Sequence, residues 1–336
     1  MDFDFSEEQY MLRDTVRDLL QKECTPAEVR RMWDDEKGRS PERWKKLGEL
    51  GVLGLTIPEA AGGSGMNELD LVLALEEAGR AILPEPLLEH AAIGAPLLAR
   101  AGTEAQKSEW LPKLATGEAT VTVGLKSQPY VQDANADLVI LEHEGELHAA
   151  TQDRLTLTPM PSVDGARRLS RVTAELDDAT RMGSADGHAA WAFDHGAAAT
   201  AAELIGIGQA MLDMTIAYAK EREQFGQKIG SFQAVQHKLA ETFLLVETAK
   251  AAVYYAAYAL AKELPDAAIH VSVAKAYASD AERRANYESL QIHAGIGFTW
   301  EHDLHLWLKR GRALEAQYGD ADWHRRRISD WVYAQR

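Results

Sequence analysis

Apolar residues recur at helical spacing near both ends of the chain and at shorter, strand-like spacing in its middle. Ser6 and Gln9 match a capping box, and a helical stripe follows at Met11, Leu12, Val16, Leu19 and Leu20. Further helices are predicted from the stripe Trp44, Leu47, Leu50 and Leu53, over 69–83 before Pro84 and Pro86, and over 107–115 before Gly117.

The pattern changes between about 120 and 185. The runs TVTVGL, ADLVILE, ELHAAT and RVTAEL are short, rich in Val, Leu, Thr and Ala, and separated by Gly, Asp and Pro. Such runs are typical of strands joined by turns, so this zone predicts a small sheet.

Long helices return after about 188. Apolar positions step by three and four through Leu204, Ile207, Met211, Met214 and Tyr218, and again from Val235 to Leu260. Another helix is predicted over 267–292, ended by Gly295 and Gly297. Stripes of this length require partner helices, which predicts a bundle. The expected fold is mostly α with a small central β domain: 1–119 helical, 120–187 β, and 188–336 helical bundle.

Composition and charge narrow the class of protein. The 336 residues suffice for two or three packed sub-domains, and no apolar run is long enough to span a membrane. The start, MDFDFSEEQY, does not resemble a signal peptide. Cys24 is the only cysteine, which excludes an internal disulfide and fits a reducing cytoplasm. The net charge of −16 argues against nucleic acid as a partner.

Two segments carry candidate chemistry. Around EREQFGQKIGSFQAVQHKLA, Arg222 is expected to end a helix, Phe225 to begin a turn, and Gln233 to start the next helix. Exposed N–H groups at a helix start and an arginine suit a pyrophosphate. A surface arginine and a buried turn phenylalanine are the alternative. In QIHAGIGFTWEHD, Gly295 either lets backbone approach a ligand or only caps the helix.

Together these segments are similar to the flavin-binding signatures of acyl-CoA dehydrogenases. GVLGLTIPEAAGGSG and QKSEWLPKLATGE resemble the same family, so the resemblance covers nearly the whole chain. It implies an N-terminal helical domain, a central β-sheet or barrel domain and a C-terminal four-helix bundle. It also implies FAD as cofactor, bound in a neighbouring subunit through five residues of this chain: Arg222, Phe225, Gln233, Gln291 and Gly295. Most family members have glycine where this chain has Ala294.

The family's reaction is α,β-dehydrogenation of an acyl-CoA, in which a carboxylate removes the α-proton. In one branch that glutamate follows a tyrosine near the C-terminus, where this chain has Gly319. In another branch it lies near the position of Gly196. We therefore identify no catalytic residue. Asp320 and Glu203 are weak candidates for a relocated base, and the alternative for both is a solvated or ion-paired surface acid. Asp194, upstream of Gly196, does not match cleanly either.

The β zone also departs from the family pattern. Neither a Thr-Glu-x-x-x-Gly-Ser-Asp segment nor a Trp-Ile-Thr-Asn-type strand is present, and Lys126 and Ser127 do not restore them. In the family these motifs hold the flavin ring and the CoA thioester. Retention of only the neighbour-facing half resembles the smaller subunit of α2β2 acyl-CoA dehydrogenases, which act on CoA thioesters of sterol side chains. The resemblance implies a catalytic partner subunit, an acyl-CoA substrate and electron-transferring flavoprotein as acceptor.

Two other hypotheses stay open. The chain could be a self-sufficient homo-oligomeric dehydrogenase with a relocated base, or a non-enzymatic scaffold or DNA-associated relative on the same fold. His302 and His305 have a spacing that could ligate a metal, but no carboxylate accompanies them, so a polar helix face is expected and no metal site is predicted.

Overall fold

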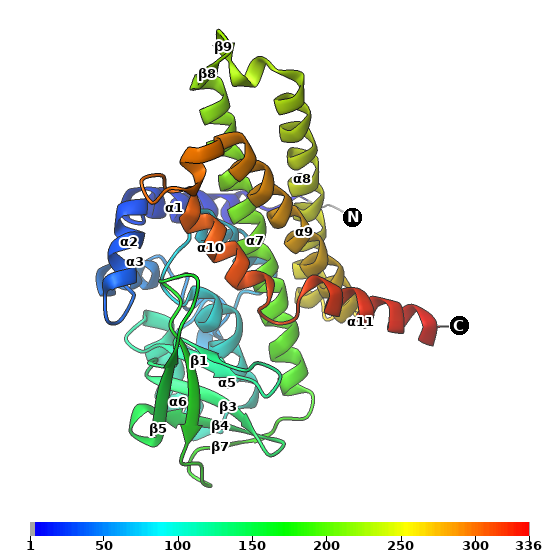
Figure 1. The fold of residues 1–336 in the computed structure, drawn as a ribbon. Coiled ribbons are helices and arrows are strands. Elements are labelled where there is room, and N and C mark those ends of the chain that lie inside the picture. The colour runs from blue at the N-terminus through cyan, green and yellow to red at the C-terminus, as the bar shows by residue number, and fades with distance from the viewer. Residues whose placement is uncertain (1–3, 336) are drawn as a thin grey trace.

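The computed structural model describes residues 4–335; the first three residues of the acidic N-terminal stretch lie outside the described residues. The N-terminal third is helical (Figure 1). It contains α1 (Glu7–Glu23), α2 (Pro26–Asp34), α3 (Pro41–Glu49), α4 (Glu68–Arg80), the π-helical segment η2 (Leu88–Gly94), α5 (Ala95–Ala101) and α6 (Glu104–Thr116). The predicted capping box is confirmed: Gln9 N donates to Ser6 Oγ at 3.2 Å, and Ser6 N donates to Gln9 Oε1 at 2.8 Å.

One predicted helix is shorter than its apolar stripe. α3 ends at Glu49, and Gly51 has a φ of +77°, which takes the chain out of helical conformation. Leu53 is fully buried nevertheless, so a turn and not a helix brings it to the core. The prediction of a helix through Leu53 is therefore wrong, because Gly51 ends the helical conformation, although Trp44, Leu47 and Leu53 are buried as the stripe predicts.

The middle of the chain forms two small sheets. The first has the strand order β1-β3-β4-β7 and the second β2-β6-β5. Their bounds are β1 (Val121–Gly124), β2 (Val131–Gln132), β3 (Leu138–His143), β4 (Glu146–Thr151), β5 (Leu155–Met160), β6 (Leu169–Ala174) and β7 (Arg181–Ser184). β1 and β3 pair in parallel, whereas the other neighbours in both sheets are antiparallel.

The C-terminal half is built on three long helices, α7 (His188–Glu221), α8 (Gln233–Ala261) and α9 (Ala267–His293). α10 (Leu304–Glu315) packs on α7 and α9, and α11 (Ala321–Ala334) packs on α9. This is the mostly helical fold with a small central sheet region that the sequence predicts. No helix in the described range 4–335 is long and apolar enough to cross a membrane.

Two glycines let α4 and α7 touch backbone to backbone. A Cβ added to Gly79 would stand 2.1 Å from the carbonyl oxygen of Glu203, and one added to Gly206 would stand 2.0 Å from that of Glu76. Neither position has room for a side chain. This contact joins the N-terminal helices to the bundle and buries Glu203 inside it.

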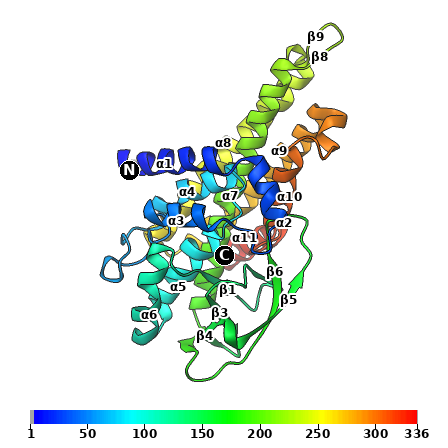
Figure 2. The same ribbon diagram turned by 90° about the vertical axis from the view of Figure 1, so that its left-hand side faces the viewer.

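One part of the bundle extends beyond the rest of the molecule. The end of α7, the short hairpin of β8 (Glu223–Gln224) and β9 (Gln227–Lys228), and the start of α8 project from the body in both views (Figures 1 and 2). Residues 221–228 are all exposed. The candidate flavin segment therefore lies on a protrusion.

Candidate functional site

The turn between α7 and α8 has the geometry that the sequence predicts. Arg222 is the residue that ends α7, and its N–H donates to Tyr218 O at 2.9 Å. Phe225 and Gly226 both have positive φ, 55° and 79°, which is the conformation of a tight hairpin turn. The alternative of a buried turn phenylalanine is wrong, because Phe225 is 93% exposed.

Unpaired hydrogen-bond donors gather at this turn. The Arg222 side chain is exposed and forms no hydrogen bond or ion pair with any residue that the structure describes. α8 starts at Gln233 without a side-chain cap, and its first turn has no acidic residue. Free N–H groups at a helix start carry partial positive charge, so this end of α8 and Arg222 together suit a diphosphate.

The second segment lies at the same end of the bundle. The rings of Tyr218, near the end of α7, and His293, at the end of α9, stack with centroids 4.3 Å apart. Lys238 Nζ, in α8, lies 2.5 Å from Glu288 Oε2 in α9. These contacts hold the Gln291–Gly295 stretch beside the end of α7 and the first turns of α8. The five residues expected to contact FAD therefore lie toward the same end of the bundle.

The backbone at the end of α9 has a conformation that favours glycine, the residue that most family members have where this chain has Ala294. α9 ends at His293, and Ala294 takes φ 53° and ψ −138°, a conformation that favours glycine. The helix therefore ends before Gly295 and Gly297, which the sequence predicts as its terminators. A Cβ added to Gly295 would meet no atom within 4 Å, so the chain is open to a ligand at that point.

Large apolar side chains lie uncovered on this end of the bundle. Phe243 and Leu244 of α8 are 52% and 62% exposed, and Tyr287 of α9 is 55% exposed. The segment after α9 adds Phe298 and Trp300, both about two-thirds exposed. Apolar surface concentrated in this way is typical of protein–protein contact.

The two positions at which the family places its base meet in space. A Cβ added to Gly196 would stand 2.6 Å from the Tyr318 ring. Gly319 has φ +86°, and a Cβ there would stand 2.9 Å from Trp323 and 3.0 Å from His324 Nε2. Neither glycine has room for a glutamate in the present backbone.

Two buried side chains hold the segment that contains Gly319. The fully buried Lys275 donates from Nζ to Glu315 O at 3.0 Å and to Gly319 O at 2.9 Å. Burial lowers the pKa of Lys275 to about 7. The His324 ring lies 2.9 Å from Tyr318 O, and burial lowers the pKa of His324 to about 4. Side chains of α9 and α11 therefore hold the carbonyl groups of this segment in place.

The two weak base candidates have different environments. Asp320 is exposed and caps α11, accepting a hydrogen bond from Trp323 N at 2.7 Å. Glu203 is 7% exposed, and its carboxyl group forms no hydrogen bond with a described residue. The expectation of a surface acid is therefore wrong for Glu203. Burial raises the pKa of Glu203 to about 7. Glu203 is buried because α4 and α7 are in close contact, and no local sequence signal indicates that contact. Asp194 pairs with Arg327 at 3.0 Å.

A small cavity lies between the β zone and α10, beside Tyr318. It has a volume of about 270 Å³ and is lined by Val123, the 128–132 loop, the 161–169 segment, and the end of α10. This is less than the roughly 300–1,000 Å³ of typical small-molecule sites. Gln128 Oε1 accepts from Tyr318 N at 3.1 Å and draws the loop against this segment. Lys126 and Ser127 are exposed at its edge.

The two histidines after α9 do not form a polar helix face, so that prediction is wrong. His302 precedes α10, and His305 is buried within it, its ring 5.9 Å from that of Trp33 and 4.6 Å from that of Trp300. Among the described residues no three His, Cys, Asp or Glu side chains are placed to hold a metal ion.

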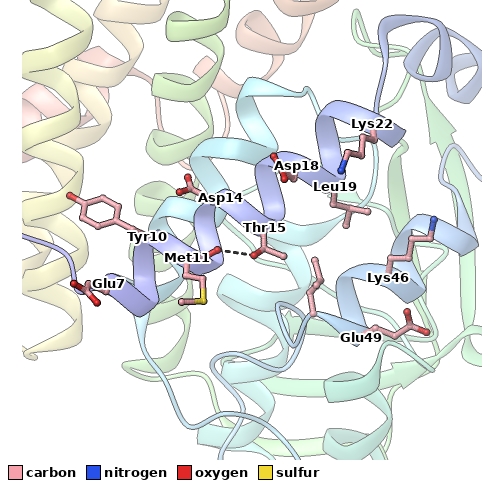
Figure 3. A pocket seen from close by; sticks show the side chains of 11 residues that line it. Glu7, Tyr10, Met11, Asp14, Thr15, Asp18, Leu19, Lys22, Lys46 and Glu49 are labelled. Atoms are coloured by element: carbon pink, nitrogen blue, oxygen red, sulfur yellow. Dashed lines mark hydrogen bonds between the residues drawn. The ribbon is translucent and has the colours of Figure 1, made fainter.

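An open groove with a volume of about 880 Å³ lies between α1 and α3 (Figure 3). Four acidic and two basic side chains line it, and Thr15 Oγ1 donates to Met11 O at 2.8 Å. None of its lining residues belongs to the C-terminal half. We place no site there, because it holds no unpaired buried group and no grouping of acid, base and nucleophile.

Comparison with known proteins agrees with this geometry. Residues 6–118 match the acyl-CoA dehydrogenase N-terminal domain, and residues 187–333 match the acyl-CoA dehydrogenase C-terminal domain. The chain is 36% identical to acyl-CoA dehydrogenase IpdE2 of Mycolicibacterium smegmatis over 98% of this chain and 100% of that protein.

Two solved structures are similar over nearly their whole length. The ChsE4-ChsE5 complex from Mycobacterium tuberculosis gives a TM-score of 0.90 at 26% identity, covering 99% of each chain. A Tcur3481-Tcur3483 steroid ACAD variant gives 0.88 at 24% identity, covering 98% of each chain, and shows the shared fold.

The chain belongs to the acyl-CoA dehydrogenase family. It is thus an oxidoreductase of the class that acts on acyl-CoA, and members of this family bind FAD.

Proposed function

We propose that this chain is the non-catalytic subunit of a heteromeric acyl-CoA dehydrogenase, and that it completes the FAD site of a catalytic partner. In this role Arg222 and the start of α8 bind the diphosphate, Phe225 lies against the adenosine half, and Gln291 and Gly295 approach the same nucleotide. The proton-abstracting base and the pocket for the flavin ring belong to the partner. The acyl group is that of a steroid-derived CoA thioester, and electron-transferring flavoprotein takes the electrons.

One observation carries the proposal: the donors at the α7–α8 turn are unpaired and project outward, whereas both family base positions are closed glycines. A site that faces away from its own chain serves another chain. The exposed Phe243, Leu244 and Tyr287 supply a contact surface beside it. The similar solved structure is a complex of ChsE4 with ChsE5, which supports a heteromer.

The proposal is tested on the natural complex, purified through a tag on this chain. We expect one FAD per two chains, with a second acyl-CoA dehydrogenase chain present in equal amount. Arg222→Gln should lower FAD retention by about tenfold or more, since one charged hydrogen-bonding group is worth about 1.5–3 kcal/mol.

The matched control is Arg154→Gln, an arginine of the β zone whose ion pair with Asp177 is exposed. It should leave the flavin content unchanged. The proposal is wrong if the lone chain binds one FAD per chain tightly and oxidises an acyl-CoA.

A second candidate function is favoured by Glu203 alone. A buried carboxyl with its pKa near 7 has the proton affinity of a general base. In a self-sufficient homo-oligomer, replacing Glu203 and Asp320 together by alanine would abolish turnover of the purified single chain. Turnover that persists in this double variant excludes both residues as the base.

A further inference from the structure

A cavity of about 750 Å³ opens between the loop after α2 and the three-stranded sheet. Its walls are Trp33, the 36–39 loop, the 134–137 segment, part of β5, and the 159–170 segment. It shares Pro161, Ser162, Arg167 and Leu169 with the smaller cavity beside Tyr318, but no lining residue comes from α7, α8 or α9. The cavity is therefore separate from the proposed FAD contacts.

Positive charge dominates this cavity, in contrast to the chain's net charge of −16. Four cationic side chains line it: Lys37, Arg39, Arg167 and Arg168. Of its three acids, Asp164 is neutralised by a buried ion pair with Arg310, and Asp137 accepts from Thr120 N at 2.7 Å and from Thr120 Oγ1 at 2.8 Å. Glu36 and Asp137 therefore remain as acids without a cationic partner among the described residues, and Glu36 is exposed.

The guanidinium groups of two of the arginines donate no hydrogen bond to a described residue. Arg39 forms no hydrogen bond or ion pair with any residue in the described range, and its Nη1 is buried. Arg167 is 8% exposed and forms a long ion pair with the buried Glu89, at 3.8 Å, but it donates no side-chain hydrogen bond within that range. Other buried arginines here are paired, as Arg43 is with Glu85 at 2.6 Å. A buried guanidinium N–H without a hydrogen-bond acceptor costs folding free energy, so a group outside the chain is expected to supply the acceptors.

The cavity walls are held in place without a ligand. The Arg168 guanidinium donates to Met32 O at 2.9 Å and also to the carbonyl oxygens of Asp35 and Gly165, which ties the loop after α2 to the sheet. Trp33 Nε1 and Asn135 Oδ1 are buried without partners. Apolar side chains, among them Leu157, Pro159 and Leu169, complete the lining.

We propose that this cavity is a binding site for an organic phosphate, with Arg39 and Arg167 as its anion contacts. A carboxylate has two oxygens, which one guanidinium occupies in a bidentate pair, whereas a phosphate has enough oxygens for two guanidiniums. The volume falls within the roughly 300–1,000 Å³ of small-molecule sites and far exceeds the ~30 Å³ share of a water. The apolar wall accommodates the organic part.

The test is isothermal titration calorimetry of the purified chain at low ionic strength, with adenosine 5′-monophosphate as probe. Adenosine and inorganic phosphate serve as comparison ligands, since each retains one part of the probe. We expect both to bind more weakly than the nucleotide. Arg39→Gln should weaken nucleotide binding by about tenfold or more, the effect of losing a charged hydrogen bond. Arg39→Lys keeps the charge, and should restore part of the affinity.

Two matched controls separate this site from others. Arg154→Gln, outside the cavity in the same β zone, should leave the affinity unchanged, and Arg222→Gln, in the proposed FAD contact, shows whether the nucleotide binds there instead. Loss of binding in Arg222→Gln with retention in Arg39→Gln would overturn the proposal, because the nucleotide would then occupy the flavin contact. Inorganic phosphate that binds as tightly as the nucleotide would also overturn it. Neither result would bear on FAD retention by the complex.

Discussion

The Tyr318 ring lies directly against the Cα of Gly196, so that a Cβ at residue 196 would stand 2.6 Å from the ring. These two residues come from segments that, in different branches of the family, supply the catalytic base. Here one segment fills the space that the other would need. The lack of a glutamate at both of these positions is therefore a property of the packing, and a single Gly→Glu substitution is not expected to be accommodated there.

Gly319→Ala tests this packing. At φ +86° an alanine is strained by about 1–3 kcal/mol, and its Cβ also meets Trp323 and His324. We expect a loss of about 2–4 kcal/mol in the free energy of unfolding, measured with urea. Gly145→Ala is the control, since φ there is +83° but no atom lies within 4 Å. An equal loss in both variants would refute the steric part of the argument.

Glu203→Gln should stabilise the protein at alkaline pH. Burial raises the pKa of the folded-state carboxyl from 4.5 to about 7, so folding favours the protonated form. Wild-type stability therefore falls as pH rises from 4.5 to 7, whereas glutamine does not titrate. We expect a gain on the order of 2–3 kcal/mol at pH 8 that disappears below pH 4.5.

Urea unfolding of both proteins across this pH range measures that difference. Glu241→Gln, an exposed acid paired with Arg284, should change stability by less than about 1 kcal/mol at every pH. A Glu203→Gln effect independent of pH would contradict the assigned burial.

Lys275→Met should destabilise the protein, because it leaves Glu315 O and Gly319 O without their donor. We expect a loss of about 2–4 kcal/mol near pH 10. The folded-state pKa of Lys275 is lowered from 10.5 to about 7, so wild-type stability falls as pH drops from 10.5 to 7. The loss should accordingly shrink toward pH 7 in unfolding curves. Lys113→Met, a half-exposed lysine of α6, should show no such trend.

Ala294→Gly should stabilise the lone chain. Relief of a positive φ gains about 1–3 kcal/mol, and the added freedom of glycine in the unfolded chain offsets about 0.4–1 kcal/mol. The net gain of roughly 1 kcal/mol should raise the urea midpoint. Ala251→Gly, in the exposed face of α8, should lower it by a similar amount. A loss in both variants would show that Ala294 is not strained.

Local chemistry made part of this structure predictable. The Ser6–Gln9 box, the Arg222 helix end and the Phe225–Gly226 turn each depend on a few consecutive residues, and the structure has all three. The fold followed from stripe lengths and from the family resemblance. Each of these signals is readable along the chain.

Burial of individual polar residues was not predictable in this way. Glu203 is buried because Gly79, over a hundred residues earlier, lets α4 contact the backbone of α7. His305 is enclosed by Trp33 and Trp300, and Arg39 meets Arg167 only after the β zone has folded against the loop following α2. These properties depend on contacts between distant segments, which hydrophobic periodicity does not encode.

Cleavage of the protruding hairpin by a protease can report whether this chain is bound to a partner. Phe225 is 93% exposed at the tip of a two-stranded turn, and chymotrypsin cleaves after such aromatic residues. In the lone chain we expect early cleavage between α7 and α8, giving fragments that stay together through the bundle. Once a partner covers the tip, the same bond is protected. The rate of this single cut therefore reports how much of the chain in a cell extract is assembled.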